Sequence, residues 1–290
     1  MGLVRCRAAD RKKTMLLKKK FPKEGSVREM IAIALPMVVS QACDTVMIFT
    51  GRFFLSKLEP EYMNAAMGGG LTVFMMMSFF LGLVGYSTAL VAQYLGAGRK
   101  KDCPLVITQA LIFSVLVYLP ILACRPLAHA FFEFMGVAPA QLVPQKIYFD
   151  ILIYGAIITL LRFSLSSFFS GIGRTGIVMV ASFTAMSVNA VLSYVLIFGK
   201  MGAPALGVRG AAYAAIVGGM SGLLVLAAAY FGRKNREEFA VGRSFRFDRA
   251  VAGKLLRFGS SPGLELFLNI LAFNTLVVIF HSHGLVTATA

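Results

Sequence analysis

Seven long apolar stretches separated by short polar connections dominate this 290-residue chain. Hydrophobic residues make up 58% of it and charged residues 14%, more apolar surface than a soluble domain of this size could bury. The stretches are continuously apolar and long enough to cross a bilayer as helices, whereas barrel strands alternate. The sequence therefore predicts an all-α, polytopic helical membrane protein, with spans at approximately residues 30–50, 65–95, 103–124, 143–170, 176–199, 205–231 and 252–282.

The basic residues are distributed unevenly between the two sides of these spans. Of 29 Lys and Arg, 21 lie before the first span or after spans two, four and six, and 5 lie in the alternate connections. Because cytoplasmic segments carry the excess of positive charge, we expect a cytoplasmic N-terminus in the cytoplasmic (inner) membrane. The net charge of +16 is then a topology signal. It predicts anionic lipid headgroups as partners of the basic tail, and no nucleic acid.

Span seven repeats the pattern of span one. Asp44 follows Pro36 by eight residues, and Asn269 takes the place of Asp44 when Ser261, beside Pro262, is matched to Pro36. Six spans followed by a seventh like the first are typical of a transporter with two six-helix halves. We therefore divide the chain into a basic cytoplasmic tail (1–28), a six-helix N-lobe (29–231), a basic cytoplasmic inter-lobe loop (232–254) and the first helix of a C-lobe (255–290).

Asp44 is the only acid in the first apolar stretch. A carboxylate inside a bilayer is costly, so Asp44 predicts a functional site that faces a bundle interior or a watery cavity. The alternative is a hydrogen bond to a neighbouring helix near the far membrane surface. Asp150 lies near the outer start of span four, with Lys146 one turn away as the expected ion-pair partner. Arg162 lies deeper in span four, either as a basic residue of the cavity or as a side chain that snorkels toward the cytoplasmic face, which the direction of the span allows.

Enzymatic motifs are nearly absent from the sequence. Residues 171–176 match G-x-G-x-x-G, but they join two membrane spans and not a strand and a helix, so they predict a tight cytoplasmic turn. Gly218 and Gly222 predict close helix packing. His281 and His283 have no third metal ligand near them in the sequence. We therefore expect no enzyme, no catalytic residue and no cofactor.

Five segments, in order along the chain, match the motifs of a known family: Ala34–Pro36 through Gln41 and Asp44–Met47, Val91–Arg99, Phe168–Thr175, Asn189–Gly199 and Gly202–Ala212. On these the chain resembles the multidrug and toxic compound extrusion (MATE) transporters, nearly throughout the region after the basic tail. The resemblance implies two six-helix lobes arranged in a V. It also implies export of cationic or amphipathic compounds against an inward flow of sodium ions or protons.

The resemblance also implies roles for individual residues. Asp44 matches the N-lobe acid of cation or proton coupling, which makes it a candidate Na⁺ ligand, and Asn189 matches its polar partner. Ser193 stands where many members have an acid. Asn269 stands where they have a glutamate, and Glu265 precedes it by one helical turn. The residues expected to line the cavity are Gln41, Ser193, Glu265 and Asn269.

Three functions are left open by the sequence. The first is a Na⁺- or H⁺-coupled antiporter for organic cations or amphipathic drugs. The second is a lipid-linked oligosaccharide flippase of the same superfamily, which would favour several basic residues in the cavity, where only Arg162 lies deep. The third is a non-transporting, degenerate membrane module. The resemblance implies about five more spans after Ala290. We therefore expect a truncated form that needs the missing C-lobe or a second copy.

Overall fold

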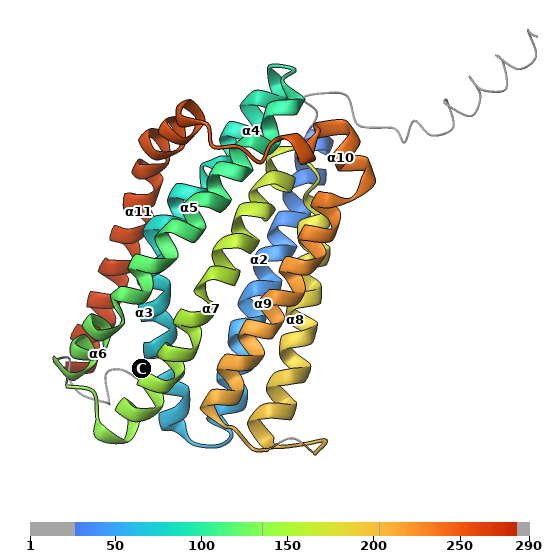
Figure 1. Cartoon of the computed structure of the whole chain (residues 1–290). Coiled ribbons are helices and arrows are strands. Elements are labelled where there is room, and N and C mark those ends of the chain that lie inside the picture. The colour runs from blue at the N-terminus through green and yellow to red at the C-terminus, as the bar shows by residue number, and fades with distance from the viewer. Residues whose placement is uncertain (1–26, 135, 203, 283–290) are drawn as a thin grey trace, which may run out of the picture.

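A computed structural model describes residues 27–134, 136–202 and 204–282, and this part of the chain contains helices and no strand. The long helices run side by side, with α11 along one edge (Figure 1). Residues 1–26 of the predicted tail and residues 283–290, which include His283, lie outside the described ranges. The helices are α2 (Val27–Ser56), α3 (Pro60–Gly85), α4 (Ser87–Gly96), α5 (Cys103–Ala123), α6 (Arg125–Phe134), α7 (Pro139–Gly171), α8 (Thr175–Phe198), α9 (Val208–Phe231), α10 (Arg233–Phe239) and α11 (Arg249–Ser282), with 3-10 turns at Lys100–Asp102 and Val241–Arg243.

The predicted all-α membrane architecture is confirmed. By length and composition, six helical segments among the described residues can cross a membrane: Met30–Ser56, Pro60–Gly96, Lys100–Ala123, Pro139–Gly171, Thr175–Phe198 and Val208–Phe231. The predicted seventh span forms the long helix α11, which packs along α3. It is not among these six segments.

Two short helices lie where the sequence predicted only connections. Helix α10 occupies the inter-lobe loop, and α6 follows span three. Both are too short to produce a long apolar run, which is why a search for spans does not find them. The second predicted span divides at Tyr86 into α3 and α4, directly after Gly85, a residue type that weakens helices.

Helix α6 turns a charged face toward α7. Arg125 donates from Nε and Nη2 to the two carboxylate oxygens of Asp150, at 2.7 Å each, and His129 Nε2 lies 2.8 Å from Oδ1 of Asp150. Lys146 donates instead to Glu133 at 2.5 Å. The expected Lys146–Asp150 pair is therefore wrong, because α6 brings a guanidinium to Asp150 and a second acid to Lys146.

Glycines set the distance between the most closely packed helices. On α11, a Cβ at Gly263 would lie 2.5 Å from the carbonyl oxygen of Phe79, and one at Gly259 would lie 2.7 Å from that of Leu83. On α9, a Cβ at Gly218 would lie 2.8 Å from Asn189 Cβ on α8. Glycine lets helix backbones approach this closely in a membrane, where packing and not hydrophobic transfer drives association. The predicted role of Gly218 in close helix packing is confirmed.

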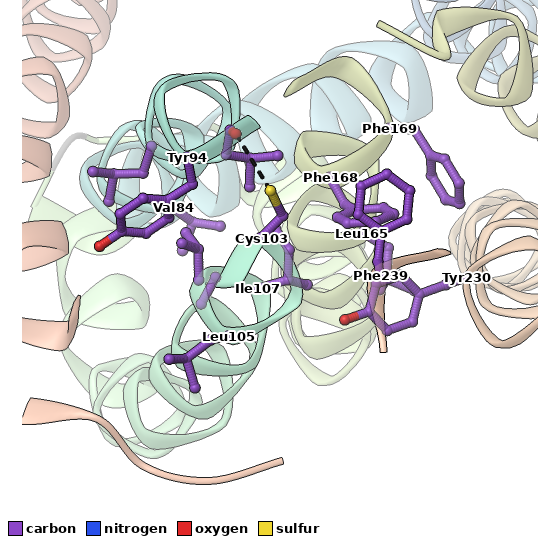
Figure 2. Packing of buried hydrophobic residues seen from close by; sticks show 14 of the residues in the cluster. Val84, Tyr94, Cys103, Leu105, Ile107, Leu165, Phe168, Phe169, Tyr230 and Phe239 are labelled. Carbon is purple, nitrogen blue, oxygen red and sulfur yellow. Dashed lines mark hydrogen bonds between the residues drawn. The ribbon is translucent and has the colours of Figure 1, made fainter. Parts of the chain in front are cut away.

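An aromatic cluster holds together the end of the bundle that carries α4 and α10. The ring of Phe168 meets those of Phe169, Tyr230 and Phe239 edge to face, with centroids 5.3, 5.0 and 5.4 Å away (Figure 2). Cys103 Sγ donates to the carbonyl of Val91 at 3.6 Å in the same region (Figure 2). Phe239 belongs to α10, so this cluster anchors the inter-lobe segment to the bundle.

Polar contacts fasten α10 to the turn between α7 and α8. Arg174 donates to Asn235 and to Glu238, the latter at 2.6 Å, and Lys100 Nζ lies 3.5 Å from Glu238. Gly173 adopts a positive φ of 73°, as expected for the tight turn predicted at residues 171–176. The predicted inter-lobe loop is therefore packed against the bundle as far as Phe239.

We predict that Gly263→Leu destabilises the protein by about 1–3 kcal/mol, since the new side chain would enter the α3 backbone. The matched control is Gly253→Ala, because Gly253 lies on the same helix and a Cβ there meets no described atom within 4 Å. This control is expected to leave stability unchanged or to raise it slightly. Thermal unfolding of the purified protein in detergent measures both changes. Equal midpoints for the two variants would contradict the close α3–α11 contact.

We predict that the contribution of Glu238 to the stability of the fold depends on pH. Burial raises its pKa, but the hydrogen bond and charge of Arg174 and the nearby Lys100 outweigh burial, and the net pKa falls below the ordinary 4.5. A lowered folded-state pKa contributes stability that is complete above about 4.5 and is lost as pH falls through the folded value. The midpoint difference between wild type and Glu238→Gln should therefore shrink below that pH. A difference that grows with acidification would contradict this ion pair.

Candidate functional site

Asp44 on α2 and Arg162 on α7 form an ion pair within the bundle. Arg162 Nη2 donates to both carboxylate oxygens of Asp44, at 2.7 Å to Oδ1 and 2.8 Å to Oδ2. The Arg162 side chain is 21% exposed and that of Asp44 is 31% exposed, so the pair is neither sealed nor freely solvated. The snorkelling interpretation of Arg162 does not hold, because its guanidinium is bound to Asp44. A counter-charge inside the bundle lies within reach of its guanidinium.

The pair joins two helices that make few other contacts with each other. Helix α2 packs mainly on α8 and α3, whereas α7 packs mainly on α3, α9 and α5. The stem of Arg162 passes α9 at Gly222, where a Cβ would lie 3.4 Å from Arg162 Cδ. A larger residue at Gly222 would therefore press on the stem that carries the guanidinium to Asp44.

Asn189 and Ser193 add two buried oxygens on α8. Asn189 is 2% exposed and Ser193 fully buried, and neither Asn189 Oδ1 nor Ser193 Oγ has a hydrogen-bond partner within the described ranges. The two residues stand one helical turn apart on the same face. Asn189 contacts α9 at Gly218, about one turn from the point where Gly222 meets Arg162. Asn189 and the ion pair therefore contact successive turns of α9.

The other predicted site residues lie apart from this group or outside its contacts. Gln41 is exposed on α2, one turn before Asp44. Glu265 and Asn269 are exposed on α11, which packs against α3, α5 and α4. Glu265 lies about 200° around the helix from Gly263, the residue that touches α3, and so points away from that contact. Their cavity-lining roles stay predictions.

The carboxylate oxygens of Asp44 become available to a cation only when Arg162 is displaced from them. Asp44, Asn189 and Ser193 supply the hard oxygen atoms that alkali and alkaline-earth cations prefer. Both oxygens of Asp44 are engaged by Arg162, so a sodium ion or a proton must displace the guanidinium to reach them. Elsewhere in the described part of the chain, no group of three or more His, Cys, Asp and Glu residues could hold a metal ion.

The pairing of Arg162 with Asp44 is the feature of the site that sequence reasoning did not find. The signal was present in the apolar stretches themselves, because one deep acid and one deep base were found there without an assigned partner. Each ion inside a membrane requires a counter-charge, so the simplest solution was to pair them. The obstacle was the separation of 118 positions, since a single sequence does not show which spans are neighbours.

Comparison with known proteins identifies this arrangement of helices. Residues 36–195 match the family model described as MatE. The chain is 27% identical over 270 residues to the "Probable multidrug resistance protein NorM" of Mesorhizobium japonicum, covering 90% of this chain and 56% of the relative. It is 29% identical over 188 residues to the "Multidrug resistance protein NorM" of Vibrio cholerae, covering 65% and 41%.

A solved structure described as the inward-facing conformation of a multidrug resistance MATE family transporter of the MOP superfamily has a similar fold. Its TM-score to this chain is 0.75 at 22% identity, over 90% of this chain and 58% of that one. The chain thus spans about half the length of the curated relatives it matches.

A double-mutant cycle tests the ion pair. We expect Arg162→Gln to destabilise the protein more than Asp44→Asn combined with Arg162→Gln, because the single variant leaves a carboxylate without its counter-charge. The coupling energy should be about 1–3 kcal/mol, reduced from that of a fully buried pair by the partial exposure of both side chains. Thermal unfolding of wild type, the two single variants and the double variant measures it. Additive effects would show that Asp44 and Arg162 do not interact.

Proposed function

Because this chain belongs to the MatE family, we propose that it supplies the N-lobe of a cation-coupled exporter of organic cations or amphipathic small molecules. The observation that carries the proposal is the partly exposed Asp44 carboxylate, which is paired with Arg162 and lies on α2, a helix that packs against α8, the helix that carries the unpartnered oxygens of Asn189 and Ser193. Its curated relatives are named as multidrug resistance proteins, which supports a small-molecule substrate over an enzymatic role.

Exchange of partners at Asp44 would provide the coupling. In the state described, the carboxylate is neutralised by Arg162. In a second state a sodium ion or a proton would neutralise it, with Asn189 Oδ1 and Ser193 Oγ able to complete the shell of a sodium ion. Each state keeps the acid paired, which avoids an isolated charge in the membrane. Alternation between the two states would link ion movement to a change in the bundle.

Export by this scheme requires a second lobe. Alternating access moves one lobe against the other around a site near the membrane midplane. Glu265 and Asn269 lie on the side of α11 turned away from α3, where a C-lobe or a second copy of the chain could cover them. We further propose an inner-membrane location with a cytoplasmic N-terminus. The end bearing α4 and α10 would then face the anionic lipid surface.

The flippase alternative has less support. Recognition of a lipid-linked oligosaccharide phosphate favours several basic residues in the cavity. Arg162 is the one such residue deep in the described spans, and Asp44 neutralises its charge. A non-transporting module would leave the unpartnered oxygens of α8 without a role, and the export experiment decides this case.

Export of a fluorescent cationic dye from cells that lack their own exporters tests the proposal. The chain is expressed alone and together with the part of the Vibrio cholerae relative that it does not match. We expect export only with that part present, and loss of export on Asp44→Asn at equal expression. Glu61→Gln, an acid near the outer start of α3, is the matched control and should leave export unchanged.

Two results would contradict the proposal. Export that survives Asp44→Asn would remove Asp44 from the coupling step. Export by a demonstrably monomeric 290-residue chain would show that one lobe is sufficient.

A further inference from the structure

Arg162 has hydrogen-bonding capacity beyond what Asp44 uses. Only Nη2 donates to Asp44, and neither Nε nor Nη1 donates to any residue that the structure describes. Neither atom is among the buried polar atoms without a partner, so both are accessible. A guanidinium carries five N–H donors in a planar fork that matches carboxylate and phosphate groups. Arg162 therefore presents unused donors beside an ion pair that is partly exposed.

We propose that Arg162 is a binding site for an acidic group, a carboxylate or phosphate, on the ligand of this lobe. The group would take the place of the Asp44 carboxylate on the guanidinium. The contact that Arg162 makes now is to a carboxylate, so the geometry needed by a ligand acid is already formed. The binding step rests on this geometry, whereas its meaning as substrate recognition rests on the proposed transport function.

The charges of the site decide the ligand class. The Asp44–Arg162 pair is neutral as a unit, and among the described residues of α2, α8 and α9 no other charged side chain joins it. A purely cationic ligand at Asp44 would leave the guanidinium without a counter-charge inside the bundle, which is costly. A ligand that carries an acidic group keeps Arg162 paired. The ligands expected to bind at Arg162 are therefore amphipathic compounds with an acidic group, including zwitterions that also carry a cationic group.

The same arrangement ties the acidic ligand to the coupling ion. Once the ligand acid occupies Arg162, the Asp44 carboxylate loses its counter-charge and requires a sodium ion or a proton. Asn189 Oδ1 and Ser193 Oγ are buried oxygens without a described partner on α8, the helix on which α2 packs.

Binding of two probes of equal size and opposite charge tests the proposal on the purified 290-residue chain. The probes are 1-naphthoate and 1-naphthylmethylammonium, and the chain contains no tryptophan to obscure naphthalene fluorescence. We expect 1-naphthoate to bind saturably and at least about tenfold more tightly than the ammonium probe. Asp44→Asn, which frees the guanidinium, should tighten 1-naphthoate by about tenfold or more.

Arg162→Gln should abolish 1-naphthoate binding, but it leaves Asp44 without its partner and could unfold the protein. The variant with both Asp44→Asn and Arg162→Gln replaces the pair with two neutral amides, and it should also lose 1-naphthoate binding. Equal affinity of the two probes for wild type would overturn the proposal. Binding of 1-naphthoate by the double variant as tight as by Asp44→Asn would overturn it as well. Because binding is measured without transport, its outcome is independent of dye export.

Discussion

A charge inside a membrane protein has to be neutralised by another group, and the interior of this bundle is organised around one such neutralisation. Asp44 and Arg162 come from helices that make few other contacts with each other, and a single guanidinium nitrogen holds both carboxylate oxygens. Because both side chains are partly exposed, the two charges can be separated at lower cost than those of a fully buried pair. In the proposed scheme, the Asp44–Arg162 ion pair both links α2 to α7 and is the site where the partner of Asp44 would be exchanged.

Glycine provides the space that this pair requires. Gly222 lets the Arg162 stem pass α9, and Gly218 lets α9 approach α8 at Asn189. On the other side of the bundle, Gly82 and Gly263 bring α3 and α11 into backbone contact, since a Cβ at Gly82 would lie 2.5 Å from Gly263 Cα. These contacts fix which helices are neighbours, and through that they fix which polar side chains can meet. The polar site therefore depends on apolar packing around residues that have no side chain.

Much of the fold was predictable because the membrane imposes a simple pattern on sequence. Each predicted span corresponds to a helix, since about twenty apolar residues in lipid have no other way to satisfy their backbone. Helices α6 and α10 were missed because each is short and held by side-chain contacts from distant segments, such as Arg125 with Asp150 and Arg174 with Glu238. Asp44 was identified from the cost of burying its charge. The unpartnered state of Asn189 could not be seen in the sequence, because it depends on what surrounds the side chain.

By itself, the sequence determined the membrane class, the approximate positions of the long helices, the uneven distribution of basic residues, and the presence of a deep acid and a deep base within the first six apolar stretches. Each of these follows from local composition, because transfer into lipid depends on the residues of one segment at a time. Only the tertiary structure decided that Arg162 reaches Asp44, that Asn189 and Ser193 face an apolar interior without partners, and that α3 separates α2 from α11. Those facts depend on which helices become neighbours. Local sequence does not show that two residues 118 positions apart, such as Asp44 and Arg162, will be in contact.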